Sequence, residues 1–144
     1  MSSDSNLIEI KNLKTYFHTE LGTVKAVDDL TVSIKEGHTL GLVGESGSGK
    51  SVTSLTIMQL LPSLVSSVEK GSHISFLGKD LLKLSEAELR KIRGNQISMI
   101  FQDPMTSLNP VLTTGYQVME AIILHQKVSR SEARKRAVAL YEEV

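Results

Sequence analysis

The pattern of apolar and polar residues predicts three β-strands in the first third of the chain and two more beyond it. Residues 7–13 alternate between the two classes, a weak strand signal, and residues 24–34 form a second strand region. The apolar runs 38–43 and 97–101 have the length and composition of buried strands, and residues 72–77 fit a further short strand. The pattern therefore predicts a sheet whose strands are separated by helical segments.

Helical periodicity and helix signals predict four helices, at residues 50–61, 85–93, 116–126 and 129–144. Pro62 stops the first helix, and Gly94 ends the second. Ser85 and Ser129 are each followed three residues later by glutamate, which is the spacing of a capping box. The third helix is apolar around most of its circumference, so we expect it to be well covered.

Composition narrows the class of protein. The length of 144 residues suits one compact domain or a piece of a larger one. With 40% hydrophobic and 22% charged residues, the composition is that of a globular protein. Sixteen basic and sixteen acidic residues balance, so no global field favours nucleic acid or an anionic membrane. The absence of cysteine excludes disulfides and thiolate chemistry, and the four histidines show no metal-ligand spacing. Any affinity for phosphate must come from local geometry.

The segment GESGSGKS fits the GxxxxGK[ST] pattern of a phosphate-binding loop in full. Its three glycines allow backbone angles that are closed to other residues and let the chain wrap closely around phosphates. The amides of the loop would point inward as an anion nest, and the N-terminus of the following helix adds partial positive charge. The cofactor-binding residues that we expect here are Gly44, Glu45, Ser46, Gly47, Ser48, Gly49, Lys50, Ser51 and Val52.

Lys50 and Ser51 would carry the chemistry of this loop. We expect Lys50 to act as a catalytic residue that reaches the β- and γ-phosphates, and the Ser51 hydroxyl to ligate Mg²⁺. The loop follows the apolar run TLGLV and precedes a helical segment, as this mechanism demands. The alternative, a chance glycine-rich turn, would lack that context. We therefore expect the loop to bind a nucleoside triphosphate, with ATP as the first candidate.

A second informative segment, ISMIFQDPMTSLNP, covers residues 97–110. A buried strand there would deliver Gln102 at its end, and ligands and metals sit at strand ends in open α/β sheets. A neutral carboxamide in that place could ligate Mg²⁺ or hold the attacking water, so Gln102 is a second catalytic and metal-binding candidate. An ordinary exit from a strand into a loop is the alternative, because proline and asparagine favour loops for local reasons.

The pairing of GLVGESGSGKS with MIFQDPMTSLNP resembles the ATP-binding subunits of ABC transporters, specifically the bacterial oligopeptide, dipeptide and nickel importer group. The resemblance extends from the first strand to the last helix. It implies that Gln102 is the Q-loop glutamine, which ligates Mg²⁺ and couples the nucleotide state to the membrane subunits. Asp103, Pro104 and residues 107–110 would then belong to the surface that touches the permease.

The resemblance also implies an upstream aromatic residue that stacks on adenine. Tyr16 and Phe17 are the candidates, and Phe17 fits the family position better when counted from the first strand. A plain core aromatic is the alternative, because aromatic side chains bury large areas in any case. The implied cofactors are ATP and Mg²⁺. The implied partners are transmembrane permease subunits, a second identical or homologous ATP-binding subunit and, indirectly, an external solute-binding protein, at the cytoplasmic face of the cell membrane.

The fold that we expect is α/β: a P-loop core sheet of the ABC ATPase type, an antiparallel N-terminal β part and the start of an α-helical subdomain. Residues 1–6 would be disordered, residues 7–110 would form the ATP-binding core, and residues 111–144 would begin the helical subdomain. The final helix reaches Val144 without a stop signal, so the sequence looks truncated and the domain incomplete.

Complete ATPases of the resembled family continue with an LSGGQ-like signature, a Walker B strand ending in Asp-Glu and a switch histidine. The chain contains no LSGG string. We therefore expect the parent protein to hydrolyse ATP to power oligopeptide or dipeptide uptake, and these 144 residues to bind nucleotide without turnover. The open alternatives are an importer of nickel or another small solute, a nucleotide-binding module, and a different P-loop enzyme such as a kinase, against which the QDPxxSLNP segment argues.

Overall fold

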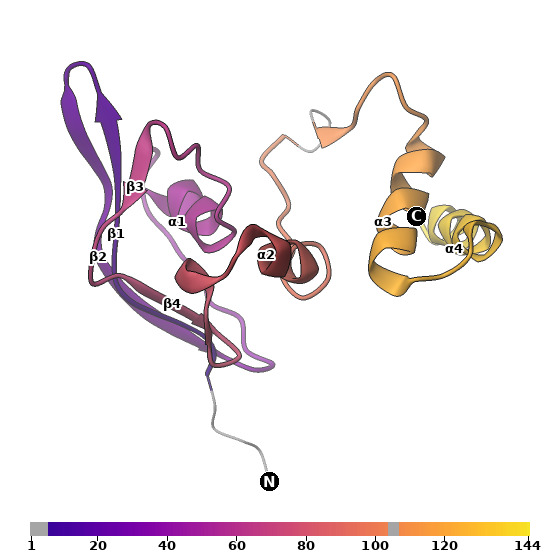
Figure 1. Cartoon of the computed structure of the whole chain (residues 1–144), viewed down its shortest axis with the longest axis horizontal. Helices are drawn as coiled ribbons and strands as arrows, with labels where there is room; N and C mark the ends of the chain where they lie inside the picture. Colours follow the sequence, from indigo (N-terminus) through magenta and orange to yellow (C-terminus); the bar gives the residue numbers. More distant parts are fainter. Residues whose placement is uncertain (1–5, 104–106) are drawn as a thin grey trace, which may run out of the picture. The chain divides into compact units, whose positions relative to one another are not determined.

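The computed structural model describes residues 6–103 and 107–144 (Figure 1). The chain divides into two compact units, Met1–Glu86 and Ala87–Val144. Asn6 is the first residue of a strand, whereas residues 1–5 of the expected disordered N-terminus lie outside the described residues. Each unit has hydrophobic residues of its own at its centre.

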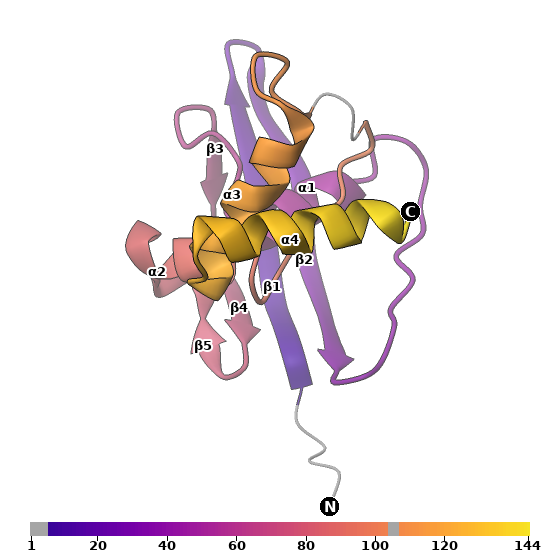
Figure 2. The ribbon, with the colours of Figure 1, turned by 90° about the vertical axis from the view of Figure 1, so that its right-hand side faces the viewer.

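The first unit is built on a five-stranded antiparallel sheet in which β1 pairs with β2, β3 and β4, and β5 pairs with β4. Its strands are β1 (Asn6–Thr19), β2 (Gly22–Lys35), β3 (Ser66–Val68), β4 (His73–Phe76) and β5 (Lys79–Asp80). The main strand order is β2-β1-β4-β5, and β3 pairs with the far end of β1. β1 and β2 form the long hairpin that is seen most clearly in Figure 2. The expected strands at residues 7–13, 24–34 and 72–77 are therefore confirmed, the first two at greater length.

This hairpin has four register shifts, of which two neighbouring ones have opposite sense. Ile10 pairs with Val32 and Leu13 with Leu30, so β1 contains one residue more than β2 between these pairs. Asn12, with φ +50°, occupies that bulge, and its N–H donates to Thr31 Oγ1 at 3.0 Å. A compensating bulge in β2 contains Asp29, at φ +67°. Because a bulge reverses which side chains face the core, both Ile10 and Leu13 are buried despite their odd spacing.

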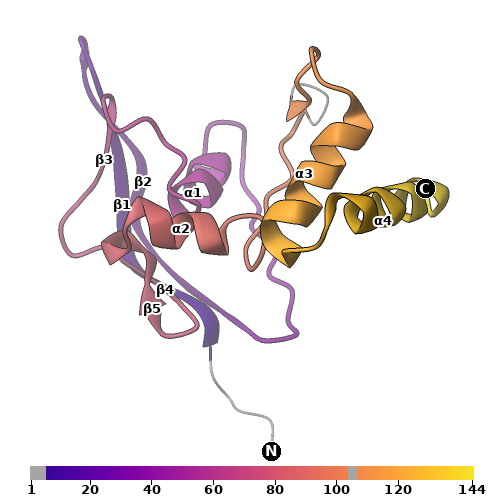
Figure 3. The same cartoon turned by 45° about the vertical axis from the view of Figure 1, so that its right-hand side comes forward.

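Helix α1 (Lys50–Ile57) contacts both long strands. Figure 3 shows it on one face of the sheet. The centre of the unit contains the fully buried side chains Leu13, Ile74 and Leu81 together with two threonines, Thr15 and Thr56. The Thr56 hydroxyl donates to its own helix at Val52 O (2.7 Å), and the Thr15 and Thr56 hydroxyls lie 3.2 Å apart. Because the Thr56 proton is engaged, Thr15 is the donor of this buried bond. It ties α1 to β1.

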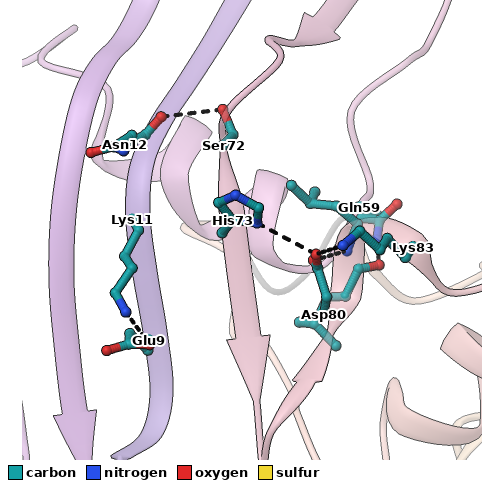
Figure 4. Close-up of polar contacts among 10 residues, drawn as sticks. Glu9, Lys11, Asn12, Gln59, Ser72, His73, Asp80 and Lys83 are labelled. Atoms are coloured by element: carbon teal, nitrogen blue, oxygen red, sulfur yellow. Dashed lines mark hydrogen bonds and ion pairs between the residues drawn. The ribbon is translucent and has the colours of Figure 1, made fainter.

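A second link joins the sheet to the short helix η1 (Leu81–Lys83), which follows β5. Asp80 caps η1 by accepting from the Leu82 N–H at 3.1 Å, and its carboxylate also lies 3.2 Å from Lys83 Nζ and 3.6 Å from His73 Nδ1 (Figure 4). Burial acts to raise the pKa of Asp80, but the bonds from Lys83 and from the Leu82 N–H outweigh it, so the pKa is lowered. The carboxylate is thus ionised and positioned at neutral pH.

The second unit consists of helices. α2 (Glu86–Ile92) begins at the boundary, and α3 (Thr114–Gln126) and α4 (Arg130–Glu142) pack on one another (Figure 2). Ile122 of α3 packs with Ala133 and Ala137 of α4, and Val118, Met119 and Val128 cover the same cluster. The Ser129 hydroxyl accepts from the Glu132 N–H, which confirms that Ser129 is a helix cap.

Two expected strands and one expected feature of α3 are wrong. Residues 38–43 and 97–101 form no strand in the described chain, and Val43 and Ile100 are about 90% exposed. An apolar run becomes a strand only when a neighbouring strand pairs with its backbone groups, and the described sheet has no such neighbour for either run. α3 is not well covered, because Leu124 is 68% exposed. α1 also ends at Ile57, four residues before the expected end.

Candidate functional site

The glycine-rich loop of residues 44–49 leads directly into α1. Gly47 and Gly49 take positive φ values of 81° and 89°, a region that favours glycine. A hydrogen bond from the Ser48 N–H to Glu45 O, at 3.2 Å, closes the turn. Gly49 is the N-cap of α1 and has no side chain to cap the first amides of the helix. Those amides therefore remain available to an anion at the N-terminus of the helix.

The Lys50 side chain bridges the two ends of the loop. Its ammonium group donates to the carbonyl oxygens of Gly44 and Glu45, both at 2.7 Å, and to Ser48 Oγ at 3.1 Å. Three oxygen acceptors within hydrogen-bonding distance hold the charge over the loop. The positions of the loop backbone and of its cation are thus set before any ligand arrives, which lowers the ordering cost of binding.

Strand β2 forms a wall of this loop. A Cβ atom on Gly49 would lie 2.3 Å from the Ala26 carbonyl oxygen and 3.4 Å from Val27 Cγ2. A cavity of about 310 Å³ adjoins the loop, and its lining includes Ala26 and Val27 of β2 as well as Ser48 and Lys50. Sequence reasoning missed these β2 residues, because nothing in their own sequence marks them as neighbours of a loop that lies beyond the end of their strand.

The other expected residues of the loop have open surroundings. Ser46, Gly47, Ser48 and Ser51 are exposed, and Val52 is half-buried in the first turn of α1. Thr53, one turn after the cap, donates its hydroxyl to Gly49 O at 2.9 Å. The structure therefore brings the expected residues Gly44 to Val52 together as one continuous loop and helix start.

The two upstream aromatic residues have different environments. The Tyr16 hydroxyl donates to Asp28 Oδ1 at 2.7 Å, and the ammonium of Lys25 lies 5.4 Å from the centre of the Tyr16 ring. The bond to Asp28 raises the pKa of Tyr16 and lowers that of Asp28. Phe17 pairs with Val24 and Ser66 through the backbone and is half-buried. The Tyr16 ring is thus already engaged within the hairpin.

Gln102 lies in the second unit, on an exposed stretch without helix or strand. Asp103 is likewise exposed, whereas Pro104 lies outside the described residues. Asn109 is ordered by Gln117 of α3, whose side chain accepts from the Asn109 N–H at 2.9 Å and donates to Asn109 O at 3.1 Å. The part of the expected permease surface near Asn109 is therefore held against the start of α3.

Comparison with known proteins identifies the family of the chain that carries this loop. The profile of the ABC transporter family matches residues 27–143. The chain belongs to the ABC transporter family. Solved ATP-binding cassettes share its fold: the dimeric post-hydrolysis structure of MJ0796 bound to ADP and Pi matches with a TM-score of 0.77 and 28% identity. That match covers 92% of this chain and 54% of the cassette.

Curated relatives within the family carry names from peptide transport. The chain is 51% identical to the oligopeptide transport ATP-binding protein AppD of Bacillus subtilis, over 97% of this chain and 42% of the relative. It is 47% identical to the oligopeptide transport ATP-binding protein OppD of Escherichia coli, over 96% of this chain and 40% of OppD. This ABC transporter chain thus spans about two fifths of the length of these relatives. Among its described residues, no helix is both long enough and apolar enough to cross a bilayer.

Proposed function

We propose that this chain binds Mg-ATP through the loop Gly44–Ser51. The observation that carries the proposal is the preformed loop, in which Lys50 bridges Gly44 and Glu45 to Ser48 and the first amides of α1 lack a side-chain cap. An uncapped helix N-terminus together with a positioned ammonium group suits a polyphosphate. Membership of the ABC transporter family supports ATP as the nucleotide.

Each expected site residue has a proposed role. Lys50 contacts the β- and γ-phosphates, the Ser51 hydroxyl ligates Mg²⁺, and the backbone of residues 44–52 surrounds the phosphates. Phe17 is the proposed adenine-stacking residue, and the engagement of Tyr16 with Asp28 and Lys25 supports this choice. Gln102 is the proposed second Mg²⁺ ligand and the link to membrane subunits.

For the whole protein we propose an ATP hydrolase that powers the uptake of oligopeptides or dipeptides. The names of AppD and OppD support this substrate class. The proposed partners are transmembrane permease subunits and a second ATP-binding subunit, at the cytoplasmic face of the membrane, with an external solute-binding protein acting indirectly. The dimeric form of MJ0796 supports the pairing of two ATP-binding subunits. A solute other than a peptide, such as nickel, is the alternative.

Calorimetry on the 144-residue chain tests nucleotide binding. Mg-ATP is expected to bind wild type with millimolar affinity or better, and Lys50→Ala is expected to bind far more weakly. Lys79→Ala removes the same charge from β5, outside the loop, and should bind as wild type does. The absence of measurable binding by wild type at millimolar Mg-ATP would refute the proposal. We expect no turnover by the chain alone, because it contains no LSGG string and no Walker B carboxylate.

Uptake by cells tests the role of the whole protein. In the source organism, a Lys50→Ala replacement is expected to abolish the uptake of a radiolabelled tripeptide without changing the abundance of the protein. Parallel measurement of ⁶³Ni²⁺ uptake separates the two substrate classes. Normal peptide uptake with lost nickel uptake would replace the peptide proposal by the alternative, and normal uptake of both would contradict an importer of either kind.

A further inference from the structure

The second unit contains a basic cavity that is separate from the phosphate-binding loop. The cavity has a volume of about 630 Å³ and forms where the end of α2 and the end of α3 meet. Five of its lining side chains are basic: Arg90, Lys91, Arg93, His125 and Lys127. Asn95 adds an amide, and no aspartate or glutamate is among the described residues that line it.

Ordered backbone holds the two sides of this cavity together. Gly94, at φ +75°, turns the chain after α2, and its N–H donates to Ile97 O at 2.8 Å. A Cβ on Gly94 would lie 2.8 Å from His125 Nε2, so the imidazole ring lies directly against this turn. Lys127 is the left-handed C-cap of α3, with its N–H bonded to Ile123 O. Lys127 and Arg93 therefore lie at defined turns, whereas Arg90, Lys91 and His125 lie on the helices themselves.

Helix dipoles account for only part of this arrangement. A cation at a helix C-terminus is favourable because the helix end carries about half a negative charge. Here Lys91 at the end of α2 and Lys127 at the end of α3 line the same concave volume, and a helix dipole does not require cations from two helices to share one cavity. The whole chain has no net charge, so its composition does not explain the concentration of cations either.

We propose that this cavity binds a small phosphate-bearing anion. Its volume lies within the range of roughly 300–1,000 Å³ that is typical of small-molecule sites. Lysine and arginine are the usual donors to phosphate, and the Asn95 amide can donate as well. Nucleic acid and anionic membranes are bound by extended basic stripes or faces, whereas these cations line a cavity from two sides. The proposal does not depend on nucleotide binding by Gly44–Ser51.

The test uses inorganic pyrophosphate as the probe and ¹⁵N-labelled chain carrying Lys50→Ala, so that binding at the phosphate loop is weakened. Pyrophosphate is expected to shift the amide signals of residues 91–95 and 124–127 and the ring signals of His125. Shifts confined to residues 44–52 would overturn the proposal. Because each signal belongs to a known residue, the experiment distinguishes a lack of binding at the basic cavity from a lack of binding at the proposed ATP site.

Matched double variants in the same background identify the cations responsible. Lys91→Gln with Lys127→Gln is expected to weaken pyrophosphate binding at the cavity by about tenfold or more, as the loss of two charge-assisted bonds predicts. Lys79→Gln with Lys135→Gln removes the same charge from residues that do not line the cavity. This control should change the affinity less than about twofold, within the modest effect expected of salt-screened charges. Equal weakening in both double variants, or citrate binding as tightly as pyrophosphate, would show only general charge attraction and would overturn the proposal.

Discussion

Replacing Gly49 with alanine tests the contact between β2 and the phosphate-binding loop. The new Cβ would lie 2.3 Å from Ala26 O, about 1 Å inside ordinary van der Waals contact. The colliding atom belongs to the backbone of β2 and not to a flexible side chain, so either β2 or the start of α1 must shift. Overpacking of this kind costs about 1–3 kcal/mol, and the left-handed φ of 89° adds about 1–2 kcal/mol for a residue with a side chain.

Gly47→Ala is the matched control for this change. Gly47 has a similar φ of 81°, but a Cβ there would meet nothing within 4 Å. The control therefore carries the backbone strain without the collision. Subtracting the stability loss of Gly47→Ala from that of Gly49→Ala leaves about 1–3 kcal/mol for the collision with Ala26.

Urea unfolding followed by circular dichroism measures this difference in the free energy of unfolding. We expect Gly49→Ala to lose about 2–5 kcal/mol and Gly47→Ala about 1–2 kcal/mol, with both losses reduced slightly because alanine restricts the unfolded chain. Calorimetry with Mg-ATP should also show the larger loss of affinity for Gly49→Ala. Equal losses of stability in the two variants would refute a β2 wall against the loop.

Three further predictions concern other parts of the structure. Thr56→Val should cost about 1–3 kcal/mol of unfolding free energy, because it leaves the buried Thr15 donor unpaired, and adding Thr15→Val should recover part of that loss. Additive losses in urea unfolding would contradict the pairing. The lowered pKa of Asp80 means that its contribution to stability is complete above the unfolded pKa of about 3.9 and is lost as the pH falls through the folded pKa. The stability difference between wild type and Asp80→Asn should therefore be present at pH 6 and vanish in strong acid, and a difference independent of pH would count against this reasoning. Gln117→Ala should release Asn109 and raise amide hydrogen exchange at residues 109–112, whereas unchanged protection there would show that the Gln117 bonds do not hold the loop.

Local rules account for the parts of this protein that were predictable from its sequence. The loop Gly44–Ser51 is a contiguous motif whose glycines, lysine and following helix act within eight residues. The cap at Ser129 likewise depends on a residue three positions away, and the alternation predicted that the two long strands exist but not where their bulges lie. Such features need no distant partner.

Tertiary structure decided the features that depend on distant contacts. Residues 38–43 and 97–101 have strand composition, yet they form no strand in the described chain because a strand exists only with a paired neighbour. The approach of Ala26 to Gly49 and the convergence of α2 and α3 on the basic cavity join residues that are more than twenty positions apart in sequence. The sequence by itself determined that this chain has a phosphate-binding loop. Only the folded structure showed that β2 forms a wall of that loop, because hydrophobic periodicity reports which residues seek burial but not which element will cover them.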